Sequence, residues 1–330
     1  MDGSLVMPGL TDLHVHAYFG GTFWGIDMDP PSLASGVTTV VDAGSAGAFN
    51  FDGLARIMRN ARVRTKAFLN IAAGGLAAPY GELLHAGAAD VGAAVRVAKS
   101  HPDLIKGLKI RASPNTVGAL AAESLAAVRR AADETRLPVM VHMSEAPPTL
   151  GMILDHLRAG DVLTHCFTPY NNCVVGADGL PRPEVMNAVE RGVRLDVGHG
   201  SGSFSFPAAE AWVRAGGPPV TVSTDLHKRA VLGPVYDMAT TMTKMLTVGL
   251  PLDSVLHAST AAPAAVIGES ASLSVGSPAD IAMLALEPGA TKLWDSRGVE
   301  RTARERLRCR LTVLRGEVAF VAPDLRVTGV

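Results

Sequence analysis

The sequence predicts an α/β fold built as a (β/α)8 TIM barrel with a small β module attached. Short apolar runs rich in β-branched residues recur along the first two thirds of the 330-residue chain, and Gly, Ser, Asp or His follows each run. Ala-rich stretches with helical spacing separate these runs, as crossovers between parallel strands require. Eight such units in about 250 residues favour a closed barrel over an open doubly wound sheet, which the count alone does not exclude.

The expected elements follow one another regularly along the chain. The expected strands are residues 10–16, 37–43, 66–72, 107–111, 138–142, 162–167, 194–198 and 219–224. Amphipathic stretches predict helices over residues 120–134 and 184–191, and Pro181 and Pro183 mark the start of the second. After Pro263, Gly and Pro turns separate short runs that are typical of β-strands. We therefore expect a barrel at residues 8–265 and a C-terminal β segment at residues 266–330.

Composition and charge restrict the partners of the chain. Hydrophobic residues make up 48% and charged residues 18%, which is typical of a compact folded protein. The formal charge of −1 provides no net field to attract nucleic acid or an anionic membrane. No apolar run reaches the roughly 20 residues of a membrane span. A small molecule is the expected partner.

The cysteines and the first residues of the chain indicate the compartment. Cys166, Cys173 and Cys309 form an odd set without CxxC spacing, which favours a reducing compartment. A loop disulfide between Cys166 and Cys173 is the alternative. The first ten residues lack the basic and apolar regions of a secretory leader, so we expect a cytoplasmic protein.

Histidines at the ends of the expected strands are the first candidates for chemistry. His14 and His16 lie two positions apart on one strand, so their imidazoles emerge on the same face and can share a metal ion. Packed or surface histidines would explain this pair on its own. His142, His165 and Asp225 strengthen the metal interpretation because each ends another expected strand, where barrel enzymes place their active sites.

Lys109 lies on the fourth expected strand, where an apolar lining would exclude a charged amine. Reaction with CO2 would turn this amine into a carboxylate that can bridge two cations. Lys106 is the competing candidate, and a salt-bridged lysine is the plain alternative. Four imidazoles, an anionic bridge and a carboxylate suit two divalent ions such as Zn2+. Such ions lower the pKa of bound water to about 7, and Asp225 could move the proton to the leaving group.

Several motifs resemble those of the amidohydrolase superfamily, namely PGLTDLHVHA, GLKIR, VHMSEAP, THCF, DVGHGSGSFSF and STDLH. The stretches DVGHGSGSFSF, STDLHKRAVLGPVYDMATTMTKML and GSPADIAML are similar to a dihydroorotase-like amidohydrolase/deacetylase group. Its members include acyl-amino-acid deacetylases and an esterase for acetylated hydroxy acids. The likeness runs from Pro8 to the end of the chain.

The resemblance implies a distorted barrel with a two-metal site. The implied ligands are His14 and His16 for the first ion, His142 and His165 for the second, a carboxylated Lys109 as the bridge, and Asp225 on the first ion. Asp225 would also act as the general acid/base. His199 is similar to a position near the substrate, where it would orient the scissile carbonyl or merely hold a loop through its ring nitrogens.

Four further residues are candidate substrate contacts. Arg111 shares a strand face with Lys109, and its guanidinium fork suits a substrate carboxylate, although a structural ion pair is equally compatible. Tyr170, Asn171 and Asn172 form a polar loop after the sixth expected strand. Such loops often satisfy only their own backbone.

One departure from these relatives concerns the N-terminus. They carry several dozen residues before the HxH strand, which build part of a small β-sandwich, whereas here residues 1–7 stand as a remnant of that segment. We therefore expect an incomplete sandwich whose strands around residues 281–286 and 311–320 expose an unpaired edge, or pair with a second subunit in a homo-oligomer.

The expected activity is hydrolysis of the amide, or the ester, of a small N-acyl or O-acyl carboxylic acid by a metal-bridging hydroxide. A cyclic-amide hydrolase or a deaminase is the nearest alternative, because the same metal site serves these reactions. A non-catalytic barrel homologue is the alternative outside enzymes. Lost ligand residues would mark such a homologue, and all six positions are retained.

Overall fold

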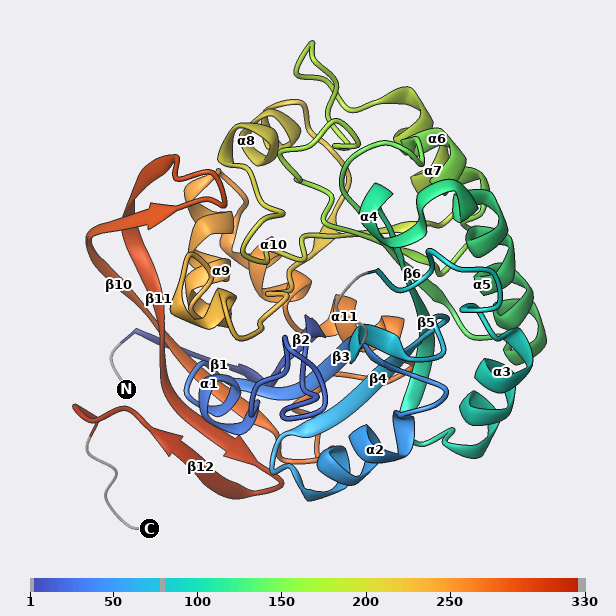
Figure 1. The fold of residues 1–330 in the computed structure, drawn as a ribbon. Coiled ribbons are helices and arrows are strands. Elements are labelled where there is room, and N and C mark those ends of the chain that lie inside the picture. Colours follow the sequence, from blue (N-terminus) through green and yellow to red (C-terminus); the bar gives the residue numbers. More distant parts are fainter. Residues whose placement is uncertain (1–2, 78–80, 326–330) are drawn as a thin grey trace.

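The computed structural model describes residues 3–77 and 81–325 of the chain. Its larger sheet is parallel, with strands β2 to β9 adjacent in chain order and helices around the outside (Figure 1). The strands are β2 Leu10–Val15, β3 Val37–Gly47, β4 Arg64–Asn70, β5 Ile105–Ala112, β6 Val139–Met143, β7 Val162–Thr164, β8 Arg194–Asp196 and β9 Val220–Thr221. The expected (β/α)8 barrel is confirmed, with a strand in each of the eight expected places.

Contacts between β2 and the segment after β9 close the barrel. Val15 forms a parallel bridge with Leu226. The Asp12 carboxylate accepts hydrogen bonds from the backbone N–H of Thr224 at 3.0 Å and from its hydroxyl at 2.6 Å. The loops that follow the first and last barrel strands therefore lie side by side.

Helices connect the strands and cover the barrel. They are α1 Asp29–Leu33, α2 Phe51–Asn60, α3 Val91–Ser100, α4 Pro114–Val117, α5 Ala121–Thr135, α6 Leu150–Asp155, α7 Pro183–Glu190, α8 Phe206–Arg214, α9 Met238–Thr247, α10 Leu252–Ala258 and α11 Ala261–Val266, with 3-10 turns at Gly75–Ala77, Gly118–Leu120 and Ala230–Leu232. Leu125, Val128 and Ala132 recur on one buried face of α5, which packs on β5. Within the described residues, no helix is long and apolar enough to cross a membrane.

A separate apolar cluster lies inside the barrel. It joins Leu13, Val41, Ala43, Phe68, Met140 and Val162 to Val266 and Ile267. The sulfur of Met140 lies 3.4 Å from the amine of Lys109, so this cluster adjoins the polar groups described below. Rigid apolar packing of this kind holds neighbouring strands in fixed positions.

The small module is a four-stranded antiparallel sheet in the order β1-β10-β11-β12, on one side of the barrel (Figure 1). Its strands are β1 Ser4–Pro8, β10 Ile281–Trp294, β11 Glu300–Leu314 and β12 Glu317–Val321. The expected unpaired edge is wrong for residues 281–285, because β1 pairs with them from Ser4 opposite Ala285 to Pro8 opposite Ile281. The sequence of β1 alone does not indicate that it pairs with β10. The division into domains stays a prediction.

Cys166, Cys173 and Cys309 are free and buried. The thiol of Cys173 donates to the carbonyl oxygen of Cys166 at 3.6 Å, so this pair is not joined as a loop disulfide. Burial raises the pKa of the Cys166 and Cys173 thiols, which keeps both of them protonated.

Candidate metal centre and active site

A cavity of about 480 Å³ opens where the barrel strands end. Its wall contains histidines, a lysine, an arginine, hydroxyl groups and two aromatic rings. The lining residues are His14, His16, Trp24, Leu76, Lys109, Arg111, Ser113, Asn115, His142, Ser144, Glu145, Tyr170, Ser201, Gly202, Ser203, Asp225 and His227. The position at the carboxyl ends of the strands is the usual place for the active site of a barrel enzyme.

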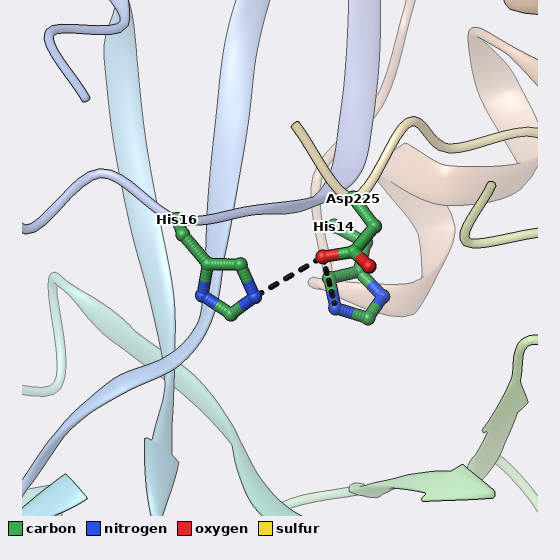
Figure 2. A group of neighbouring side chains, drawn as sticks. All are labelled: His14, His16 and Asp225. Atoms are coloured by element: carbon green, nitrogen blue, oxygen red, sulfur yellow. Dashed lines mark ion pairs between the residues drawn. The ribbon is translucent and has the colours of Figure 1, made fainter. Parts of the chain in front are cut away.

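His14, His16 and Asp225 form a compact group in this cavity (Figure 2). One carboxylate oxygen, Asp225 Oδ1, lies 3.4 Å from His14 Nε2 and 3.1 Å from His16 Nε2. One ligand atom from each residue falls within 4.8 Å of the other two. Two imidazoles and a carboxylate at this spacing are suitable ligands for a divalent metal ion.

Hydrogen bonds fix which nitrogen of His14 faces the cavity. The Thr164 hydroxyl donates to the Asp196 carboxylate at 2.7 Å, so it must accept from His14 Nδ1, which lies 3.0 Å away. The proton of His14 is therefore on Nδ1, and the lone pair of Nε2 points at the group around Asp225. A carboxylate that orients a ligand histidine in this way is a common support of metal sites.

His16 and His165 are held through the same ring nitrogen. His16 Nδ1 lies 2.9 Å from the Ser45 hydroxyl, and His165 Nδ1 donates to the carbonyl oxygen of Gly198 at 2.6 Å. The Nε2 atom of His165 is buried and has no hydrogen-bond partner among the described residues. A buried nitrogen with a free lone pair is costly unless it binds something, so this atom fits a metal ligand.

His142 and His165 lie beside the first group. Their ring centroids are 4.4 Å apart, and that of His165 is 5.0 Å from that of His14. Burial lowers the pKa of His165 to about 4 and holds that of His142 well below its usual value. Both imidazoles are neutral, as metal ligands must be.

Lys109 lies in the same cavity wall as His14, His16 and His142. Its side chain is almost wholly buried, with Nζ 3.2 Å from His14 Nε2. Burial lowers the pKa of its amine to about 7, so a large neutral fraction exists near pH 7. Lys106, the competing candidate, instead donates to the backbone oxygen of Pro102, away from the cavity lining.

Asp225 is the negative charge of the site. Burial alone would raise its pKa, but the charge of His14 when its ring carries both protons, together with the hydrogen bond from His16, outweighs that effect and holds the pKa well below its usual value. The backbone of Asp225 is left-handed, with φ 49°, and that of His165 likewise, with φ 66°. Such strained positions cluster at functional sites, where the surrounding structure maintains them.

A model of the Amidohydrolase family matches residues 5–330, which is nearly the whole chain. The chain belongs to the amidohydrolase family. A deacetylase of Brucella anthropi is 38% identical over 305 residues, covering 90% of this chain and 75% of the relative. A solved structure described as an adenine deaminase superposes with a TM-score of 0.93 at 32% identity, covering 96% of this chain and 88% of that one. A second solved structure, described as a dihydroorotase, superposes with a TM-score of 0.89 at 36% identity, covering 95% of this chain and 85% of that one.

In this amidohydrolase, Gly198 leaves room for the close approach of Thr164, His165 and His14. Its φ is 48°, and an added Cβ would collide with Thr164 Oγ1 and lie 2.9 Å from His165 Nδ1. We expect Gly198→Ala to lower the free energy of unfolding by about 1–3 kcal/mol and metal affinity by roughly 10–100-fold. Urea unfolding and metal titration measure the two effects.

Gly202 provides the matched control in the same loop, because a Cβ added there meets nothing within 4 Å. Gly202→Ala should leave both quantities unchanged. Equal effects of the two alanine substitutions would show that any added side chain disturbs this loop, and that the close approach at Gly198 is unimportant.

The amidohydrolase holds His199 outside the cavity lining. The ring is fully buried and stacks on Phe204 at 4.5 Å between centroids. Its Nδ1 donates to the Gly200 carbonyl at 2.8 Å, and its Nε2 lies 2.7 Å from the amine of Lys244, which also donates to the carbonyl of Trp294 at 2.7 Å. This geometry favours the loop-holding role of His199, and a direct contact with substrate stays a prediction.

The four candidate substrate contacts divide into two pairs. Arg111 and Tyr170 line the cavity, whereas Asn171 and Asn172 hold a neighbouring loop. The Asn171 side-chain oxygen accepts from the backbone N–H of Ala146 at 3.0 Å, and the Asn172 amide donates to the carbonyl of Pro148 at 2.9 Å. The second pair therefore satisfies the backbone, as such loops often do.

Arg111 combines both roles that the sequence left open. Its Nη1 pairs with Glu82 Oε1 at 2.5 Å, and the residue also contributes to the cavity wall. A guanidinium has five N–H donors, so the pair with Glu82 leaves donors for a ligand. Tyr170 carries Arg297 over its ring, 4.7 Å from the centroid.

Sequence reasoning missed several groups of the site, among them two rings of the cavity wall and a carboxylate behind it. Trp24 and His227 line the cavity, and Asp196 orients His14 through Thr164. His227 follows Asp225 by two residues within the STDLH motif, and that spacing was the available signal. Asp196 opens the DVGHGSGSFSF motif, which was the available signal for that residue, whereas nothing in the chain near Trp24 indicates that it would reach the site.

Proposed function

We propose that the chain is a metal-dependent hydrolase that cleaves the amide, or the ester, of a small N-acyl or O-acyl carboxylic acid. The observation that carries the proposal is the convergence of His14, His16 and Asp225 within 4.8 Å, in a cavity that also contains Lys109 and His142. The deacetylase at 38% identity favours acyl transfer to water over the other reactions of the family.

The residues fit two divalent metal ions. The proposed ligands are His14, His16 and Asp225 for one ion, His142 and His165 for the other, and Lys109 between them. The buried, unpartnered Nε2 of His165 and the neutral imidazoles support this set, and Zn2+ suits its nitrogen and oxygen donors. When bound, the ions supply an activated water and polarise the substrate carbonyl.

Residues of the chain supply the remaining steps. The neutral amine of Lys109 attacks CO2, forming an N–C bond and releasing one proton, so that the product is a carbamate anion. The Asp225 carboxylate takes a proton from the attacking water and delivers it to the leaving nitrogen or oxygen. Arg111 offers its remaining donors to the carboxylate of the acid. This assignment of roles is part of the proposal.

Two alternative reactions have specific support. Solved structures described as an adenine deaminase and a dihydroorotase superpose closely on this chain, so deamination and opening of a cyclic amide use a barrel of the same shape. We further propose that the protein acts in the cytoplasm, which its free, buried thiols favour. The state of assembly, including a homo-oligomer, stays a prediction.

A substrate panel combined with metal analysis tests the proposal. Protein purified without chelator should contain divalent metal and hydrolyse N-acetyl amino acids or acetylated hydroxy acids faster than dihydroorotate or adenine. Removal of the metal with a chelator should abolish activity, and Zn2+ should restore it. Full activity in metal-free protein would contradict the metal mechanism, and faster turnover of adenine or dihydroorotate would contradict the substrate class.

A further inference from the structure

His227 lies in the cavity wall without a role in the proposed mechanism. It follows β9 by six residues, is 5% exposed and lines the cavity. Its ring centroid is 6.2 Å from that of His16 and 4.8 Å from that of Trp24. The ring therefore lies beside the group that the first metal ion would bind.

Backbone hydrogen bonds determine the protonation of this ring. His227 Nδ1 lies 3.2 Å from the backbone N of Arg229 and 3.5 Å from that of Ala230, and both N–H groups donate to it. A backbone N–H can only donate, so Nδ1 must carry a lone pair and the proton of the neutral ring must be on Nε2. The Nε2 atom faces the cavity side, 3.4 Å from the hydroxyl of the lining residue Ser201.

This arrangement is the reverse of the one at the proposed ligands. His14 and His165 donate through Nδ1 and direct the lone pair of Nε2 inward. His227 accepts through Nδ1 and directs an N–H inward, so neither of its nitrogens is free to bind a metal ion. The same residue type thus supplies acceptors on one side of the cavity and a hydrogen-bond donor on the other.

We infer that His227 is a catalytic residue that donates its Nε2–H to the acyl oxygen of the substrate as negative charge develops there. The inference rests on the proposed function, because it requires a carbonyl as the reacting group. A donor already fixed by the backbone needs no reorganisation when the charge appears, which makes it effective in stabilising an oxyanion. The guanidinium of Arg229 lies over the Trp24 ring, 5.3 Å from its centroid, and helps to hold that ring where it packs on His227.

The protonation of the ring can be measured without substrate. In protein labelled with 15N at histidine, with His227→Asn used to assign the signal, the ring should carry its proton on Nε2 at pH 7. A proton on Nδ1, or on both nitrogens, would overturn the inference, because Nδ1 could then not accept from the backbone.

Two substitutions separate the donor from the backbone contact. In His227→Asn, the amide oxygen can replace Nδ1 toward Arg229 and Ala230, but no group replaces Nε2–H. In His227→Gln, the longer amide can replace Nε2–H but not Nδ1. We expect His227→Asn to lower kcat by about 10²–10³-fold, with KM, metal content and the free energy of unfolding nearly unchanged. His227→Gln should retain activity to within roughly tenfold of the wild type, less than the cost of a lost donor.

A phosphonate analogue of the tetrahedral intermediate gives a readout other than activity. Its affinity should fall in His227→Asn by about the same factor as kcat, whereas the affinity of the product acid should not change. If His227→Asn were active and His227→Gln inactive, the inference would be overturned, and His227 would have only a structural role. A wild-type enzyme inactive on all N-acyl and O-acyl acids would instead contradict the proposed function, and the inference with it.

Discussion

Replacing Asp225 by asparagine should lower kcat/KM by about 10⁴-fold, at the upper end for general acid/base groups. The amide keeps the shape of the side chain, but it cannot carry a proton between water and leaving group, and it removes the negative charge beside His14 and His16. Steady-state kinetics on an N-acetyl amino acid measures the loss. Metal content, measured on the same samples, shows how much of it comes from weaker metal binding.

Asp161 provides the matched control for this substitution. It is also buried, and it precedes β7 at the opposite end of the strand from His165, where it accepts from the backbone N–H groups of Val139 and Arg158. Asp161→Asn should lower the free energy of unfolding. It should leave kcat/KM of the folded protein within about threefold of the wild-type value, because the protein that remains folded keeps its site intact. Retained activity in Asp225→Asn would disprove the proton-transfer role.

The second large effect is expected at Lys109, where stability and activity should change in opposite directions. Lys109→Met should abolish activity, because the proposed bridge between the two metal ions cannot form without the amine. The same substitution should stabilise the metal-free protein, since an apolar side chain replaces an amine that burial penalises. Residues that lower the stability of the fold but are needed for activity are typical of active sites.

The stabilisation by Lys109→Met should depend on pH. The amine has a pKa of about 7 in the folded chain, and about 10.4 when unfolded. Between these values the unfolded state binds more protons, so the wild-type protein gains stability as the pH rises. The advantage of the methionine variant should therefore be greatest at pH 7 or below and shrink toward pH 10, as urea unfolding of metal-free protein would show.

Lys244→Met is the control, because Lys244 is the other fully buried lysine of the described residues. Its amine has three acceptors, namely His199 Nε2 and the carbonyls of Pro234 and Trp294, each at 2.7 Å. Methionine would leave all three unsatisfied, so this variant should be less stable than the wild type. A Lys109→Met variant that is likewise destabilised would show that Lys109 is a structural lysine.

The sequence predicts the barrel and the grouping of its ligands because both follow from local pattern. All proposed ligands except Lys109, which lies within β5, lie at or near the end of a short apolar run, and parallel strands in a barrel bring such ends together. His14 and His16 need only the two-residue period of a strand to share a face. No long-range information is required for this part of the site.

The remaining features depend on contacts between distant segments. Asp196 reaches His14 only through Thr164 on the neighbouring strand, and Glu82 meets Arg111 from a loop. The proton of His227 is positioned by two backbone groups that become adjacent when the turn after it forms. Residues 1–7 were expected as the remnant of a β segment, but the pairing of β1 with β10 was not predicted, because it joins segments that are far apart in the sequence.

The closure of the barrel has a consequence for the nascent chain. Asp12 and Thr224, which join its two ends, are 212 residues apart in sequence. His14 and His16 leave the ribosome before Asp225, which follows the last strand of the barrel, β9. Until Asp225 has been made, the chain therefore exposes a histidine pair without its carboxylate, and the complete group of His14, His16 and Asp225 exists only once the ring of strands has closed.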